Sequence, residues 1–191
     1  EDETCLVVKY LRENPDIYNL GILLVFETGM GGELAALSPY DIGDCVIKIR
    51  RTEVKRDENG KWVATVKEHP KTSAGCRDLI ISPSALKTIQ SAMALNQTAL
   101  FFLNTTEREF EETPLINGFQ DICKKLGIPH RTMHKIRKTY GTMLIDSSQL
   151  TDAFVAAQMG HSDISCTRRY YYFSNKTIAK NKQQIEQIIS F

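Results

Sequence analysis

The chain has 191 residues with 42% hydrophobic residues, which fits one sizeable globular domain of ordinary composition. No apolar run reaches the roughly 20 residues that a membrane span requires, and no signal peptide is visible, so we expect no membrane partner. Five scattered cysteines without a CxxC pair favour reduced thiols in a cytoplasmic protein. The four histidines lack the spacing of metal ligands, so we expect no metal.

The formal net charge of +1 is low for a domain that binds nucleic acid. Local basic patches matter more than the total, and the chain has four of them: Arg50 to Arg56, Lys135 to Lys138, Arg168-Arg169 and Lys176 to Lys182. The first residue is a glutamate, so we also expect an upstream part of the protein that carries further phosphate contacts.

Apolar residues at helical spacing open the chain. Thr4 is the predicted N-cap of a first helix, Ile17 to Glu27 form a second, and a short helix follows Gly32. From Cys45 the period changes to two, which predicts strands.

Segments 45–50 and 62–67 both alternate in this way, and Asn59-Gly60 between them is a strong tight-turn signal. We therefore expect these two segments to form a hairpin. Residues 77–82 read as a third strand, reached through the polar loop 70–75.

The rest of the chain is helical by its spacing, with helices predicted at 83–93, 114–126, 132–147, 151–159 and 164–173. The predicted fold is mainly α with one small antiparallel β-sheet, an α+β domain over residues 1–173. Residues 174–191 form a tail that ends in an apolar stripe at helical spacing, made of Ile185, Ile188, Ile189 and Phe191. The stripe either docks on a neighbouring protomer or covers its own domain.

The chemistry-bearing residues gather in the second half of the chain. His134 and Arg137 are three apart on one predicted helix, so both can reach the same phosphate. Arg137 can clamp charged oxygens, and His134 and His161 can donate hydrogen bonds or move protons. Tyr170 stands nine residues after His161 and can attack phosphorus. This pattern indicates chemistry on a phosphodiester.

The surrounding segments resemble motifs of the tyrosine recombinases, the phage integrase family. His134-Lys-Ile-Arg137-Lys-Thr-Tyr-Gly-Thr-Met-Leu is similar to the second motif box, and Met159-Gly160-His161-Ser-Asp-Ile164-Ser-Cys-Thr167 to the LGHxxIxxT element. The family spacing selects Tyr170 among three consecutive tyrosines. Neighbours on a helix lie about 100° apart, so only one of the three can point into a given site. The resemblance runs from about residue 4 to about residue 173.

This resemblance implies the catalytic-domain fold of the tyrosine recombinases and a site-specific DNA recombinase. Such an enzyme cuts and rejoins strands through a 3′-phosphotyrosyl intermediate, without ATP, a metal or another cofactor. It implies double-stranded DNA as the partner and a tetramer on two duplexes. The chain looks most like integrases of conjugative transposons and prophages, which implies integration and excision of a mobile element at the nucleoid, in the cytoplasm of a bacterial cell.

The resemblance also implies individual roles. Tyr170 is the nucleophile, Arg137 clamps the phosphate, His134 is general base or acid, and His161 hydrogen-bonds the scissile phosphate. Pro70-Lys71-Thr72-Ser73, before Arg77, resembles the PKTxxSxRxI hairpin, whose lysine protonates the leaving oxygen; here that lysine is Lys71. Supporting and DNA-binding residues are expected at Glu33, Lys135, Lys138, Arg168 and Arg169.

One departure lies in the first box, where the family reads TGxRxGE-L. The chain reads Thr28-Gly29-Met30-Gly31-Gly32-Glu33-Leu34, one residue short and without the arginine. The arginine was changed to a residue that the sequence omits, or was deleted, or the protein is a natural pseudo-enzyme. We favour the first explanation, because a deletion within a helix would rotate all that follows by about 100°.

Losing one preorganised donor typically costs on the order of 10²–10³ in rate, so the chain as written is predicted to be impaired. Two other classes stay open. A type IB topoisomerase-like enzyme shares the tyrosine chemistry but needs no partner duplex. A non-catalytic DNA-binding module would account for the missing arginine.

Overall fold

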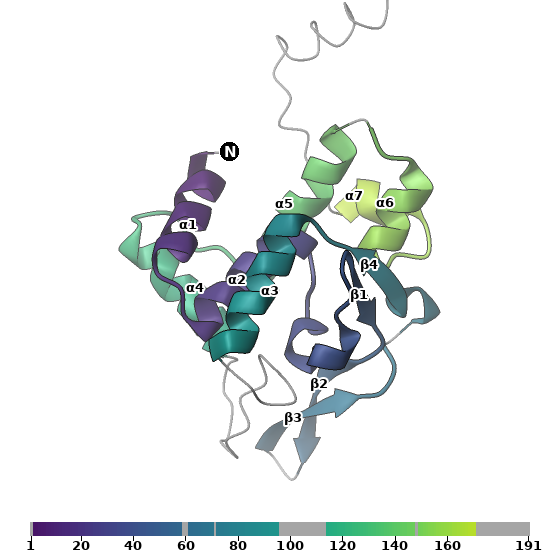
Figure 1. Ribbon diagram of the computed structural model, residues 1–191, viewed down its shortest axis with the longest axis horizontal. Helices are drawn as coiled ribbons and strands as arrows, with labels where there is room; N and C mark the ends of the chain where they lie inside the picture. Colours follow the sequence, from purple (N-terminus) through teal and green to yellow (C-terminus); the bar gives the residue numbers. More distant parts are fainter. Residues whose placement is uncertain (1, 59–60, 71, 96–113, 148, 171–191) are drawn as a thin grey trace, which may run out of the picture.

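The computed structural model describes residues 2–58, 61–70, 72–95, 114–147 and 149–170. Helices dominate this part of the chain, and two small antiparallel sheets of two strands each accompany them (Figure 1). The expectation of a mainly helical α+β domain is confirmed, although one sheet was expected and two are present. Across the described ranges, no helix is long and apolar enough to cross a membrane.

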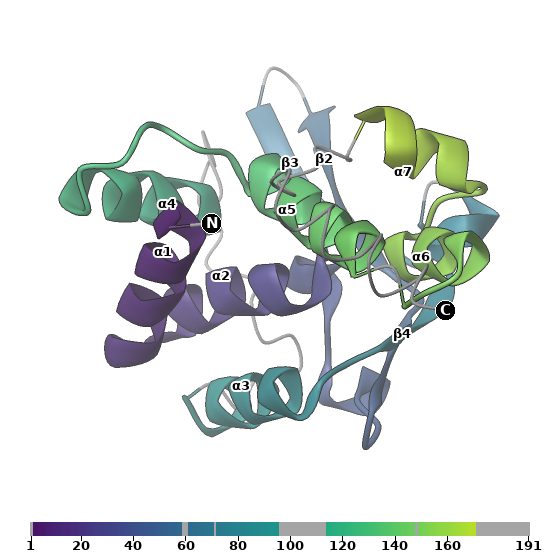
Figure 2. The ribbon, with the colours of Figure 1, turned by 90° about the horizontal axis from the view of Figure 1, so that it is seen from above.

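Helix α2 (Ile17–Thr28) is the centre of the helical part, because it is apolar on nearly every side. The side chain of Asp16 caps its start by accepting hydrogen bonds from the amides of Tyr18 and Asn19. Gly29 ends it in the left-handed conformation, with φ of 65°. The helices α1 (Asp2–Glu13), α3 (Pro83–Leu95), α4 (Pro114–Lys125) and α5 (Met133–Asp146) all contact α2 (Figure 2).

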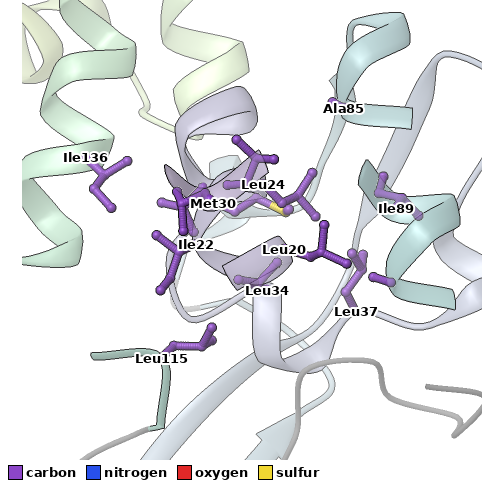
Figure 3. Packing of buried hydrophobic residues seen from close by; sticks show 14 of the residues in the cluster. Leu20, Ile22, Leu24, Met30, Leu34, Leu37, Ala85, Ile89, Leu115 and Ile136 are labelled. Carbon is purple, nitrogen blue, oxygen red and sulfur yellow. The ribbon is translucent and has the colours of Figure 1, made fainter. Parts of the chain in front are cut away.

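The main core surrounds α2 and reaches into the strands. Aliphatic side chains from α2, the following turn and three other helices converge there (Figure 3), among them Ile22, Leu24, Met30, Leu34, Ile89, Leu115 and Ile136. Burial of this kind is the dominant favourable term in folding. Packing in this core therefore determines the position of the C-terminal end of α2 and the position of α5 beside it.

The predicted helices are present with small shifts at their ends. The predicted N-cap at Thr4 is wrong, because α1 already begins at Asp2 and Thr4 lies in its first turn. Apolar spacing, which starts only at Leu6, gave no signal for that polar first turn. The remaining helical elements are η1 (Leu34–Ala36), η2 (Pro39–Asp41), η3 (Ser73–Gly75), α6 (Asp152–Met159) and α7 (Ile164–Tyr170).

The strand pairing differs from the expected hairpin. Strand β1 (Val46–Ile49) pairs with β4 (Arg77–Ile80), and β2 (Thr52–Glu58) pairs with β3 (Lys61–Lys67). The predicted pairing of 45–50 with 62–67 is therefore wrong. A two-residue turn pairs the residues on either side of it, here Glu58 with Lys61, and the polar sequence of β2 hid that strand. The Asn59-Gly60 turn itself lies outside the described residues.

Helices α6 and α7 sit at the other end of α5 from α1 and α4, with α6 also against β4 (Figure 2). A second small core joins them to α5 through Tyr140, Val155 and Met159. All five cysteines are unpaired in the structure, and reduced thiols stay a prediction. The predicted tail 174–191 lies outside the described residues.

Candidate active site

Arg137 of α5 lies where the first box meets the end of α6. Its Nη1 donates to the carbonyl of Gly29, and its Nη2 donates to the carbonyl of Met159. Nη2 also lies 3.5 Å from Nε2 of His161. The half-buried guanidinium of Arg137 thus joins two segments that the sequence motifs placed in one site. Two of the predicted site residues, Arg137 and His161, are brought together.

The turn after α6 presents His161. Gly160 ends the helix with φ of 66°, and the amide of His161 donates to the carbonyl of Ala156 at 2.9 Å. Gly160 is therefore the C-terminal cap of α6, and His161 lies outside the helix. Nδ1 of His161 lies 2.6 Å from the hydroxyl of the buried Thr167, which fixes the plane of the ring.

The His161 ring is neutral at neutral pH. Burial, followed by the charges of Arg137 and Arg77, lowers the pKa of His161 to about 4. A neutral imidazole keeps one donor and one acceptor nitrogen. With Nδ1 engaged by Thr167, Nε2 is the nitrogen that can exchange hydrogen bonds with a phosphate beside Arg137.

Glu33 is held by a buried arginine that its own motif does not contain. Its Oε1 lies 3.2 Å from Nη1 of Arg77, and its Oε2 accepts from the amide of Gly31 at 2.7 Å. Burial opposes ionisation of Glu33, but Arg77 and then Arg137 outweigh it and hold the pKa of the carboxyl below its ordinary value. The carboxylate of Glu33 thus pairs with Arg77, and the supporting role of Glu33 stays a prediction.

Gln158 attaches α6 to strand β4. Its Nε2 donates to the carbonyl of Ile80 at 2.5 Å and to the hydroxyl of Tyr140 at 3.1 Å, while its Oε1 accepts from the amide of Ile80 at 3.2 Å. This buried side-chain amide pairs with both backbone groups of Ile80, as a residue of a neighbouring strand would. Gln158 therefore fixes the position, relative to β4, of the turn that carries His161.

His134 lies one helical turn before Arg137, and its side chain is exposed. Partial removal of water from this largely exposed ring, and then the neighbouring charges of Lys138 and Arg137, lower the pKa of His134. Tyr170 is the last residue of α7, and its side chain lies outside the described residues, as does Lys71. The roles of His134, Tyr170 and Lys71 stay predictions.

The basic residues expected to bind DNA lie on α5 and α7. Lys135 is exposed and Lys138 half-buried, while Arg168 and Arg169 are exposed. Arg168 donates to the carboxylate of Asp152 at 2.9 Å, so part of its charge is balanced within the chain. Their DNA-binding role also stays a prediction.

Three residues with evident positions in the site were not among the predicted site residues: Arg77, Gln158 and Thr167. Thr167 is the threonine of the segment that resembles the LGHxxIxxT element, and Arg77 also carries a signal in the sequence. It alternates in phase with the apolar Leu79 of β4, which places a charge on the inner face of the sheet. A charge in such a place is normally paired, and this one is. In the described ranges, no three histidine, cysteine or carboxylate side chains are grouped as a metal site, and a metal-free reaction stays a prediction.

Comparison with known proteins supplies the family. The chain matches the Phage integrase family over residues 16–177. It is 27% identical over 172 residues to a protein named tyrosine recombinase XerC-like from Caldanaerobacter subterraneus subsp. tengcongensis, covering 78% of this chain and 44% of that protein. It is 30% identical over 168 residues to a protein of Mycobacterium tuberculosis named as a prophage phiRv2 integrase, covering 83% of this chain and 43% of the relative.

Solved structures share the fold. The Tn1549 transposon integrase in complex with circular intermediate DNA superposes with a TM-score of 0.75 at 19% identity, covering 98% of this chain and 65% of that one. The XerA recombinase gives a TM-score of 0.67 at 20% identity, covering 99% and 64%. The chain spans less than half the length of the two curated relatives named above. The sequence motifs, the fold and these similarities agree, and the chain belongs to the phage integrase family of tyrosine recombinases.

Proposed function

We propose that this chain is the catalytic part of a site-specific DNA recombinase that integrates and excises a mobile element. The observation that carries the proposal is the meeting of Arg137, the Gly29 carbonyl and the His161 turn at one point. A guanidinium beside a neutral imidazole is suited to bind a phosphate and stabilise charge that develops on it. The curated relatives carry the names of recombinases and prophage integrases, which supports this interpretation.

In the proposed reaction, the phenolic oxygen of Tyr170 attacks a DNA phosphorus and a new P–O bond forms. The bond from phosphorus to the 5′-oxygen breaks, which leaves a 3′-phosphotyrosyl link. His134 accepts the phenol proton, and Lys71 donates a proton to the departing 5′-oxygen. A 5′-hydroxyl of a partner strand then reverses these steps and joins a new strand.

The direct test is a covalent trap. Duplexes that span the borders of the mobile element are nicked beside the scissile phosphate, so that the 5′-hydroxyl diffuses away and the adduct accumulates. We expect an adduct that disappears in Tyr170→Phe and persists in the matched variants Tyr171→Phe and Tyr172→Phe. Placing an arginine between Met30 and Gly31 should raise the rate on the order of 10²–10³.

The two alternatives give different outcomes in related assays. A DNA-binding module would bind the duplex and form no Tyr170-dependent adduct even with the arginine restored. A type IB topoisomerase-like enzyme would form the adduct and relax supercoils, but would not exchange strands between two marked duplexes. We expect strand exchange.

The proposed DNA surface is basic and exposed on α5 and α7. Each phosphate that a protein neutralises makes the slope of log K against log salt more negative by about 0.9. We therefore expect Lys135→Gln and Arg169→Gln each to reduce this slope by about that amount. Lys87→Gln, which removes an exposed lysine from α3, is the matched control and should leave the slope unchanged.

The domain boundary and the assembly are also proposals. Residues 1–173 form the catalytic domain, and the tail 174–191 docks on a neighbouring protomer, which couples tetramer assembly on DNA to activity. We place this activity at the nucleoid in the bacterial cytoplasm. A variant truncated after Ser174 should bind DNA but lose multimers in sedimentation. Unchanged multimers would mean that the tail covers its own domain.

A further inference from the structure

Arg77 is the most deeply buried charged side chain of the site, with 8% of its surface exposed. It joins three segments that lie far apart in the sequence. Nε donates to the carbonyl of Gln158 at 3.1 Å, and Nη1 reaches both Glu33 at 3.2 Å and the carbonyl of Gly75 at 3.1 Å. These contacts connect the end of α6, the first box and the loop that precedes β4.

The third nitrogen of this guanidinium is different. Over the described residues, Nη2 of Arg77 is buried and has no hydrogen-bond partner. An unpartnered buried donor on a charged group costs more than an ordinary lost hydrogen bond, so it calls for an explanation. A ligand that arrives with its own oxygens would provide one.

The surroundings of Arg77 indicate where such a ligand would lie. Arg77 and His161 both line one open pocket of about 580 Å³, within the size range of small-ligand sites. The guanidinium packs against Gly160, where a Cβ would lie 2.7 Å from Nη1. Asp163 also lines the pocket, but its carboxylate accepts from the amide of Ser165.

Arg77 and Arg137 donate hydrogen bonds to successive backbone carbonyls at the end of α6. Arg77 donates to the carbonyl of Gln158, and Arg137 donates to the carbonyl of Met159. These two residues directly precede Gly160 and His161 in the chain. The two guanidinium groups are close enough for the charge of Arg137 to act on Arg77. A dianionic transition state beside His161 would be stabilised by both.

We propose that Arg77 supplies a second guanidinium to the reacting phosphate, with its unpartnered Nη2 donating to a non-bridging oxygen. This inference rests on the proposed function and assigns Arg77, the arginine of the segment that resembles the PKTxxSxRxI hairpin, to charge stabilisation. It does not change which bonds are made and broken. The bond from the Tyr170 oxygen to phosphorus forms, and the bond from phosphorus to the 5′-oxygen breaks. Arg77 only offsets the charge that builds on phosphorus oxygens.

The test separates charge stabilisation from a structural role. The nicked duplex is made with an ordinary phosphodiester or with a methylphosphonate at the cleaved position, in which a methyl group replaces one charged oxygen. We expect Arg77→Gln to slow adduct formation on the order of 10²–10³ on the phosphodiester but less than tenfold on the methylphosphonate. Lys87→Gln removes an exposed lysine from α3 and should act equally and weakly on both.

If Arg77→Gln does not fold, Arg77→Lys is used in its place, because lysine keeps the charge. The ratio of the rate losses on the two duplexes then decides between charge stabilisation and a structural role. Equal losses on both duplexes would make Arg77 a structural residue and overturn the inference. All variants are also made with the arginine restored between Met30 and Gly31. If that chain forms adduct and Arg77→Gln leaves its rate unchanged, the inference fails while the proposed function stands. If neither chain gives a Tyr170-dependent adduct, both fail.

Discussion

The helical region around α2 and the junction around His161 are held together by different interactions. Ile22 and Leu24 of α2 are fully buried among other aliphatic side chains. At the junction, Arg77 and Arg137 donate charged hydrogen bonds to the carbonyls that precede His161. One region is stabilised by apolar area removed from water, the other by directional bonds to the backbone.

This contrast separates stability from geometry. Apolar burial has no preferred direction, and a core accepts changes that conserve volume at little cost. Charged hydrogen bonds to specific carbonyls hold a turn in one place, which is what the proposed phosphate site would require. We therefore expect damage to the α2 core to lower stability, and damage to the junction to change activity out of proportion to stability.

The largest expected effect on stability is in the α2 core. Leu24→Ala should lower the free energy of unfolding by about 2–5 kcal/mol, because it removes buried methyl groups and leaves a cavity. Urea unfolding followed by circular dichroism measures this value. Leu6→Ala, at a leucine of α1 with 43% of its surface exposed, is the matched control and should cost much less. Similar costs at the two positions would remove the contrast between core and surface.

A pair of glycines tests how tightly the junction is packed. Gly160 and Gly127 both have φ of 66°, so alanine costs about 1–2 kcal/mol at either. A Cβ at Gly160 meets Arg77, whereas at Gly127 it meets nothing within 4 Å. We expect Gly160→Ala to lose about 1–3 kcal/mol more than Gly127→Ala in thermal or urea unfolding. Equal losses would mean that Arg77 moves aside freely.

Gln158 sharpens the comparison within α6. Gln158→Met keeps the length of the side chain but removes its bonds to the Ile80 backbone and the Tyr140 hydroxyl. We expect a loss of about 1–3 kcal/mol in unfolding free energy. Adduct formation should fall by a larger factor than in Leu24→Ala, when both are assayed where each is fully folded. A loss of stability with unchanged adduct rate would count against a positioning role.

The smallest expected effect is a pH dependence of stability from His161. Because the pKa of His161 is lowered to about 4 in the folded chain, the unfolded chain binds more protons below its ordinary pKa. Stability should therefore fall as the pH drops from about 6.5 to about 4. The half-buried ring limits this to about 1 kcal/mol.

Unfolding of the chain and of His161→Gln across this range measures the contribution. The variant should show a shallower dependence than the parent chain. Glu33, whose pKa is lowered, contributes only at lower pH, since its stabilisation is lost as the pH falls below the ordinary carboxyl value. Identical slopes for the two proteins would contradict the neutral state of His161.

Some features of this protein were determined by the sequence alone. Helical spacing predicted most helices to within a few residues, and the motifs around Arg137 and His161 were sufficient to indicate the family. These signals are local, because helix formation and caps such as Gly160 depend on residues within a few positions of one another.

Other features depended on segments that are distant in the chain. The partner of β1 is β4, and Arg77 bonds to Gln158 across 81 residues, as Arg137 bonds to Gly29 across 108. No local pattern states which strand completes a buried face or which carbonyl meets a buried guanidinium. Only tertiary packing decides these pairs, because it alone determines which groups lose water together and must satisfy one another.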